Sequence, residues 1–139
     1  MQEAIFYEKK YDEMARRYAQ SKGKTTSMDV TWDTTGRWLS VIKPCLPHLD
    51  LFMPNEKEAS LITGQKTPEK MAEFFLKYGV KIAVIKLGAK GAYIRSGNEE
   101  FYQTAFESEV TDTTGAGDSF VAGFLSQYIK DCSLKECTV

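Results

Sequence analysis

Residues 111–120, TDTTGAGDSF, place three small residues directly before an aspartate, where an extended stretch gives way to a helical pattern. Because Gly115, Ala116 and Gly117 carry little or no side chain, an anion can approach their backbone N–H groups closely. The positive end of the following helix points to the same place. Asp118 in the first helical turn could accept a proton from a substrate hydroxyl while the N–H groups stabilise a transferred phosphoryl group. The stretch therefore predicts a phosphate site with a catalytic base.

The same residues also allow a purely structural interpretation. Gly115 would supply a turn conformation, Gly117 would permit close packing, and a carboxylate at a helix start stabilises it by about 0.3–1 kcal/mol. Two familiar nucleotide motifs do not fit, since a Walker A loop needs GxxxxGK, and a dinucleotide fingerprint needs a small residue where Phe120 stands. This pattern alone does not decide between a phosphate cradle and a simple turn that opens a helix.

Four stretches of the chain together resemble the ribokinase-like (PfkB) carbohydrate kinases. DTTGAGDSF looks like the C-terminal signature of that family, and it is preceded in family order by DVTWD (29–33), PNEKEA (54–59) and VIKLGAKGA (84–92). The resemblance spans most of the chain. It implies phosphorylation of a sugar or sugar-like hydroxyl by ATP, with Mg²⁺ as a cofactor.

The resemblance also implies roles for residues of the signature. Asp118 would be the base that deprotonates the sugar hydroxyl, and Gly115, Ala116 and Gly117 would form the anion hole for the γ-phosphate. Asp112 and the Thr114 carbonyl resemble part of the family's monovalent-cation site, which would hold K⁺. The other ligands of that site come from a segment that follows the signature in the family.

Asn55 and Glu58 match the family's N-x-x-E motif, which helps to place Mg²⁺ and the triphosphate. Without the family, Asn55 followed three residues later by Glu58 indicates a capping box at a helix start, and the two roles are compatible. Mg²⁺ usually keeps several waters and binds one or two carboxylates plus phosphates. Glu58 is therefore expected to act on Mg²⁺ through water.

Lys86, Gly88 and Gly91 lie where the family's nucleotide loop leaves a strand, which implies a cofactor-binding role. LGAKGA is also a good tight turn between two strands, and its glycines would be needed for that alone. Asp29 and Asp33 lie at the end of a predicted strand, at the sheet edge where α/β folds bind ligands. Their position is the only sequence evidence for a functional role.

The elements that would position these residues alternate between strand and helix. Tyr7, Tyr11, Met14 and Tyr18 form an amphipathic stripe that predicts a helix within 3–23. Short buried strands are expected within 25–30 and 49–54, with a brief helix within 32–46 between them. A capped helix opens at Asn55, and a longer one runs from Pro68, after an N-cap at Thr67, to Gly79. An apolar strand then covers 80–87, two strands within 91–105 meet at 96–98, and the last long helix ends near 130.

This alternation predicts a three-layer α/β fold, a ribokinase-like (Rossmann-like) core with a mainly parallel sheet and an antiparallel edge from about 91 to 105. By resemblance, residues 1–139 form a partial kinase domain with the nucleotide and phosphate half. The sugar-binding half and the C-terminal end would be absent. Ser133 and Glu136 indicate a further capping box, which predicts the start of another helix close to Val139.

Composition limits the partners. With 42% hydrophobic and 27% charged residues, a formal net charge of −1 and no basic stripe, the chain is typical of a globular domain and not of a nucleic-acid binder. Three cysteines without a CxxC pair and the single His48 predict neither a disulfide framework nor a zinc site, and so a reducing, cytoplasmic setting. No apolar run approaches the roughly 18 residues of a membrane span.

Two functions from different classes follow. The first is the carbohydrate kinase, with the 139-residue chain by itself expected to be a poor or inactive enzyme. The second is a non-catalytic fragment that binds nucleotide or self-associates, because an incomplete sheet leaves an open edge through which copies could pair.

Overall fold

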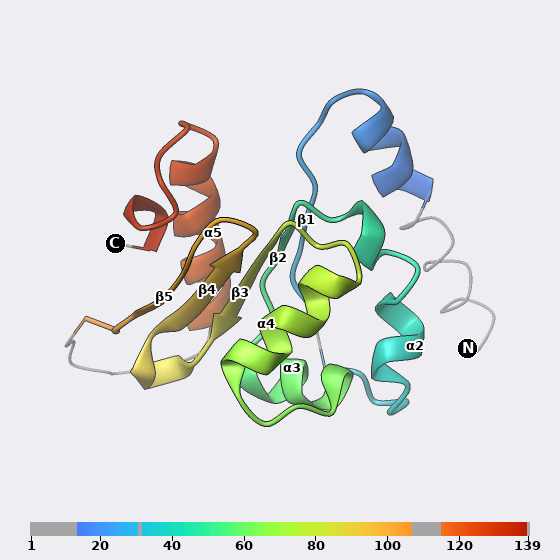
Figure 1. The fold of residues 1–139 in the computed structure, drawn as a ribbon, viewed down its shortest axis with the longest axis horizontal. Helices are drawn as coiled ribbons and strands as arrows, with labels where there is room; N and C mark the ends of the chain where they lie inside the picture. Colours follow the sequence, from blue (N-terminus) through green and yellow to red (C-terminus); the bar gives the residue numbers. More distant parts are fainter. Residues whose placement is uncertain (1–13, 31, 107–114, 139) are drawn as a thin grey trace.

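The computed structural model describes residues 14–30, 32–106 and 115–138. They build one five-stranded mixed sheet in the order β1-β2-β3-β4-β5 (Figure 1). β1 pairs with β2 and β2 with β3 in parallel, whereas β4 runs antiparallel to β3 and to β5. The strands are Ser27–Met28 (β1), Leu51–Phe52 (β2), Ile82–Lys86 (β3), Ala92–Ser96 (β4) and Glu100–Gln103 (β5). The antiparallel edge expected within 91–105 is therefore confirmed.

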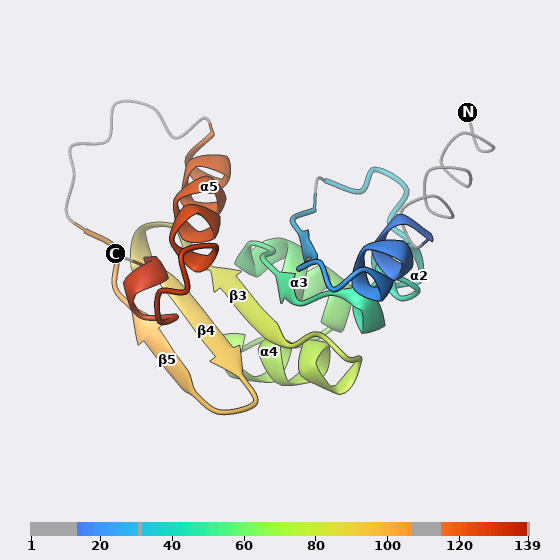
Figure 2. The same cartoon turned by 90° about the horizontal axis from the view of Figure 1, so that it is seen from above.

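Helices cover both faces of this sheet, which gives the expected three layers. In Figure 2, α3 and α4 lie on one face and α5 on the other. Residues 14–21 are also helical, and the residues before 14 lie outside the described part of the chain. The α-helices are Trp38–Ile42 (α2), Glu56–Thr63 (α3), Pro68–Lys77 (α4) and Ala116–Tyr128 (α5), and short 3-10 turns cover Leu46–His48 (η1), Gly88–Lys90 (η2) and Glu136–Thr138 (η3).

The core has two parts because side chains alternate across β3. Ala83 and Ile85 pack with α2, α3 and α4, and Val84 packs with Phe124 of α5 on the opposite face. The apolar run at 80–87 correctly predicted a strand covered on both faces. Its two neighbours differ in direction, however, because the tight turn after β3 folds β4 back antiparallel to it.

Helix ends follow the sequence signals. Asn55 and Glu58 form the full capping box at the start of α3. Pro68 opens α4, whose Met71 and Phe75 are buried, and Gly79 follows that helix at φ +100°. Thr67 is the N-cap residue of α4, as predicted, and has extended backbone there, although its side chain makes no capping hydrogen bond.

Two further expectations are corrected at the margins of the sheet. β1 is half-buried, not buried, because it is an edge strand with a neighbour on one side only. Ser133 and Glu136 do exchange capping hydrogen bonds, but only the 3-10 turn Glu136–Thr138 follows them.

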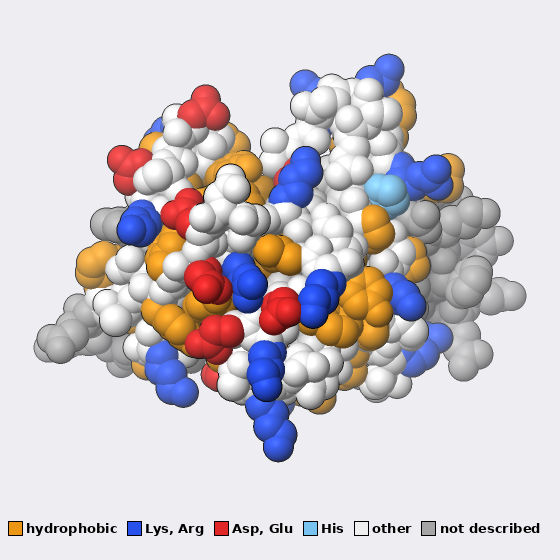
Figure 3. Space-filling view, in the orientation of Figure 1, with side chains coloured by type: hydrophobic (Ala, Val, Ile, Leu, Met, Phe, Trp, Pro, Cys, Tyr) orange, Lys and Arg blue, Asp and Glu red, His pale blue; other side chains and the backbone are white. Residues whose placement is uncertain are grey.

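The surface carries charges of both signs, and the cysteines are not paired in disulfides. On the face shown in Figure 3, Lys and Arg side chains are interspersed with Asp and Glu side chains over α4 and its neighbours. Cys45, Cys132 and Cys137 form no disulfide in this structure. Within 14–30, 32–106 and 115–138, none of the helices has the length and apolar character needed to cross a bilayer.

The capping residues give a direct stability test. We expect Asn55→Ala to lower the free energy of unfolding by about 0.5–2 kcal/mol, because the Glu58 N–H at the start of α3 loses its acceptor. Thr67→Ala is the matched control and should change the free energy of unfolding by less than about 0.5 kcal/mol. The Thr67 side chain is exposed and makes no capping hydrogen bond at the start of α4. Urea unfolding of the two variants measures both values, and equal losses would contradict this assignment of the caps.

Candidate active site

Three polar residues meet at the carboxyl ends of the parallel strands. Asp29 follows β1, Asn55 follows β2, and Lys86 is the last residue of β3. The backbones of Asn55 and Lys86 form a parallel bridge, and the Lys86 N–H donates to the Pro54 carbonyl at 2.9 Å. The Lys86 ammonium lies 2.6 Å from the Asp29 carboxylate. Residues 57 positions apart are therefore joined at one edge of the sheet.

The N-terminus of α5 lies at the same edge. Gly115 is its N-cap with φ +76°, and no side chain caps this end of the helix. Gly115, Ala116, Gly117 and Asp118 are all exposed. A Cβ at Gly117 would be only 3.5 Å from the Lys86 ammonium, which places the glycine-rich turn beside the strand ends.

This geometry suits an anion. The first N–H groups of a helix have no partner inside the helix, and the helix dipole adds partial positive charge there. Asp118 stands in the first turn of α5, where its exposed carboxylate is accessible to a hydroxyl of a bound substrate. The turn and the phosphate cradle are thus compatible interpretations, since no side chain caps the N–H groups at this start of α5.

Glu58 is the buried carboxyl of the site. Only 7% of the residue is exposed, and its carboxylate accepts a hydrogen bond from the Asn55 N–H at 2.9 Å. Burial raises the pKa of Glu58 above its ordinary value. The Asn55 hydrogen bond opposes this rise, the charge of Asp29 adds to it, and the charge of Lys86 opposes it. Glu58 is thus close to both charges while its own carboxylate is occupied by the cap.

These residues fit Mg²⁺ held through water. In the described part of the chain, no group of three or more His, Cys, Asp and Glu side chains is arranged to hold a metal ion directly. Mg²⁺ needs only one or two carboxylates when waters and phosphate oxygens supply the other ligands. The carboxylate of Glu58, together with that of nearby Asp29, supplies this number of carboxylates.

The glycines of KLGAKGA are explained by the turn itself. Gly88 has φ +60° and Gly91 has φ +101°, and the Gly91 N–H donates to the Gly88 carbonyl at 2.9 Å. Leu87 closes the turn by donating its N–H to the Gly91 carbonyl at 2.8 Å. The tight turn predicted between the two strands is confirmed, and it places Lys86 and Gly88 beside the strand ends. A nucleotide contact by Lys86, Gly88 or Gly91 stays a prediction.

The two aspartates of DVTWD have different roles. Asp29 enters the site through Lys86, which sequence position alone did not reveal. Asp33 instead accepts hydrogen bonds from the N–H groups of Thr35 and Trp38, both at 2.8 Å. Burial alone would raise the pKa of Asp33, but these hydrogen bonds outweigh it and lower the pKa. Asp33 therefore stabilises the loop before α2.

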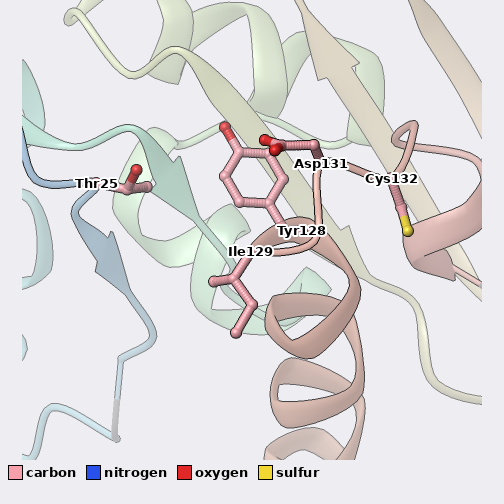
Figure 4. A pocket seen from close by; sticks show the side chains of 5 residues that line it. All are labelled: Thr25, Tyr128, Ile129, Asp131 and Cys132. Atoms are coloured by element: carbon pink, nitrogen blue, oxygen red, sulfur yellow. The ribbon is translucent and has the colours of Figure 1, made fainter.

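Asp112 and Thr114 lie outside the described residues, so their part in a monovalent-cation site stays a prediction. A separate pocket of about 440 Å³ is lined by Thr25, Tyr128, Ile129, Asp131 and Cys132 (Figure 4). Tyr128 is the last residue of α5, so this pocket lies about 18 Å along the helix axis from the glycine-rich turn. Among the described residues, none of the predicted site residues lines it.

The comparison with known proteins decides the family. The pfkB family carbohydrate kinases match residues 7–138. The chain belongs to this family. A relative in this family, the 2-dehydro-3-deoxygluconokinase from Bacillus subtilis (strain 168), is 36% identical to this chain over 123 residues. The match covers 84% of this chain and 38% of that kinase. This family transfers phosphoryl groups, and its fold is the ribokinase-like fold expected from the sequence.

Solved structures of the family are similar to the chain. Arabidopsis thaliana ribokinase complexed with ribose and ATP has a TM-score of 0.81 at 29% identity and covers 94% of this chain and 43% of that one. A putative ribokinase II from E. coli in complex with ATP and Mg²⁺ has a TM-score of 0.78 at 28% identity. That match covers 89% of this chain and 42% of the E. coli chain. The chain thus spans about two fifths of these relatives. The monovalent-cation site, the cytoplasmic location and self-association stay predictions.

Proposed function

We propose that the chain supplies the nucleotide and phosphate half of an ATP-dependent sugar kinase. The observation that carries the proposal is the convergence of the Lys86 ammonium, the Glu58 carboxyl and the uncapped start of α5 at one edge of the sheet. The relatives crystallised with ATP, with Mg²⁺ and with ribose support it. The acceptor is a hydroxyl of a sugar or sugar-like molecule.

In this proposal Asp118 is the general base. Its carboxylate accepts the proton of the acceptor hydroxyl as that oxygen attacks the γ-phosphorus, which makes the oxygen a better nucleophile. The bond from the γ-phosphorus to the β,γ-bridging oxygen breaks in the same step, and ADP is the leaving group. Its position at the start of α5 puts it beside the N–H groups that would receive the phosphate. A base and a phosphate cradle on one rigid turn keep the reacting groups in a fixed relation.

The N–H groups of Gly115, Ala116 and Gly117 would stabilise the charge on the transferred phosphoryl group. Preorganised donors of this type need no rearrangement during the reaction, and removing one costs about 10²–10³ in rate in a well-studied case. Small residues are needed here because the Lys86 ammonium already lies against Gly117. A larger side chain would fill the space that the phosphate requires.

Asn55 and Glu58 would hold the hydrated Mg²⁺ and the triphosphate, and the turn from Lys86 to Gly91 would lie along the nucleotide. Mg²⁺, when bound, neutralises phosphate charge and aligns the β- and γ-phosphates. Glu58 is buried and accepts a hydrogen bond from the Asn55 N–H, which fixes the start of α3, and it would contact Mg²⁺ through the metal's waters.

Protection against heating tests this proposal. ATP with Mg²⁺ at about 100 times its Kd should stabilise the chain by about 2.7 kcal/mol, which raises Tm by several degrees. Adenosine at the same concentration should give a much smaller shift because it lacks the phosphates, and ATP without Mg²⁺ an intermediate one. If ATP with Mg²⁺ leaves Tm unchanged at millimolar concentration, the proposed function is rejected.

A further inference from the structure

The Lys86–Asp29 ion pair is a fixed part of the sheet edge. The Lys86 side chain is 13% exposed and the Asp29 side chain 26%, so both charges are largely shielded from water. Lys86 ends β3 and its own N–H is bonded to the Pro54 carbonyl, while Asp29 follows β1 directly. A pair anchored by two strands of one sheet holds its geometry better than a pair of flexible surface side chains.

The surroundings of this ammonium are electrostatically unusual. The start of α5, which carries partial positive charge, lies within contact distance of the Lys86 ammonium at Gly117. The Lys86 ammonium and the partial positive charge at the start of α5 therefore lie side by side at Gly117. In the part of the chain that the structure describes, Asp29 is the hydrogen-bond acceptor of this ammonium, which has three donors to offer. Glu58 adds negative charge nearby, but its carboxylate is bonded to the Asn55 N–H.

This arrangement favours an anion between Lys86 and α5. An ammonium and uncapped helix N–H groups around one point complement a phosphate group, which accepts from both. Asp29 would keep the Lys86 side chain pointed at α5 instead of extended into solvent. Lys90 in the same turn offers a contrast, since it is exposed.

We propose that Lys86 contacts the phosphate held at the start of α5 and that Asp29 is the positioning residue that aims it there. The inference rests on the proposed function and assigns to these two side chains a task that the motif alone does not specify. It also explains why an aspartate stands at the end of β1, at the edge where the site forms.

Binding of phosphate-bearing probes tests the pair. Lys86→Met should weaken binding of ATP with Mg²⁺ and of tripolyphosphate by about 10- to 100-fold, as expected for the loss of a charge-assisted hydrogen bond. Asp29→Asn should weaken both by about 5- to 10-fold, since the lysine is kept but no longer held. Lys130→Met is the matched control and should bind both probes like the unchanged chain, because Lys130 is an exposed lysine beyond the opposite end of α5. Calorimetric titration measures all four proteins, and circular dichroism verifies that each is folded.

Three outcomes separate the possible errors. If the unchanged chain binds ATP with Mg²⁺ and Lys86→Met binds equally well, the inference is wrong and the proposed function stands. If Lys86→Met loses affinity but Asp29→Asn does not, the positioning role of Asp29 is wrong. If the unchanged chain binds neither probe, both the inference and the proposed function fail. Lys86→Arg adds a second check on Lys86, because it keeps the charge and should retain more affinity than Lys86→Met.

Discussion

Replacing Asp118 by asparagine is expected to lower kcat for sugar phosphorylation by about 10²- to 10⁴-fold, the usual contribution of a positioned general base. Asparagine keeps the size and the hydrogen-bonding reach of the side chain but cannot accept the hydroxyl proton. Asp118 is exposed in the first turn of α5, so the change should leave the fold intact. KM for ATP should change by less than about twofold, because phosphate binding would depend on backbone N–H groups.

A chimeric kinase gives this prediction a measurable rate. The segment of the Bacillus subtilis 2-dehydro-3-deoxygluconokinase that matches this chain would be replaced by the chain's own residues, which align over 123 positions. ADP release is then measured with that kinase's substrate. Asp131→Asn is the control, since Asp131 is an exposed aspartate with φ +60° and asparagine tolerates that conformation. If Asp118→Asn kept more than a tenth of the rate, Asp118 would not be the base.

Replacing Gly91 by alanine should be the most destabilising single methyl addition among the described glycines, at about 3–5 kcal/mol. The added carbon would overlap the Gln103 carbonyl oxygen and lie 2.7 Å from the Ala105 nitrogen. Gly91 also has φ +101°, which L-residues rarely adopt. Both obstacles are backbone, so β5 would have to move away from the turn that follows β3.

Two other glycines of the same region separate the causes. Gly88→Ala tests the positive φ alone, because φ is +60° and a Cβ there meets nothing within 4 Å; about 1 kcal/mol is expected. Gly97→Ala tests neither obstacle and should change the unfolding free energy by less than about 0.5 kcal/mol. Urea unfolding of the three variants should rank Gly91 far above Gly88 and Gly88 above Gly97. Similar losses for Gly91 and Gly97 would contradict the packing described for this turn.

Local signals in the sequence predicted most of the fold. Pro68 and the apolar spacing of Met71 and Phe75 located α4, because a fixed φ and a 3.6-residue period act within one helix. The glycines of KLGAKGA located the turn after β3 for the same reason. Periodicity did not give the directions of the two neighbours of β3, since an apolar strand looks the same beside a parallel or an antiparallel partner.

The candidate site was predicted in part. Asp118 and the glycines before it are adjacent in sequence, so a motif was enough to place them at one helix start. The ion pair of Asp29 with Lys86 was not predicted, because it joins residues 57 positions apart and exists only once β1 and β3 are aligned in the sheet. Thr67 was correctly predicted as the N-cap residue of α4, but the residue type did not reveal that its side chain makes no capping hydrogen bond, since a preference for a residue type does not decide its rotamer.

Hydrogen exchange of the chain with and without ATP and Mg²⁺ tests the central claim most directly, because it shows where the nucleotide binds. We expect slower exchange in peptides that contain residues 55–58, 86–91 and 115–118. We expect no change in peptides that cover residues 128–132, a segment that carries four of the five residues lining the distant pocket. Protection confined to residues 128–132, or no protection at saturating ATP and Mg²⁺, would contradict the claim that the strand ends and the start of α5 form the phosphate site.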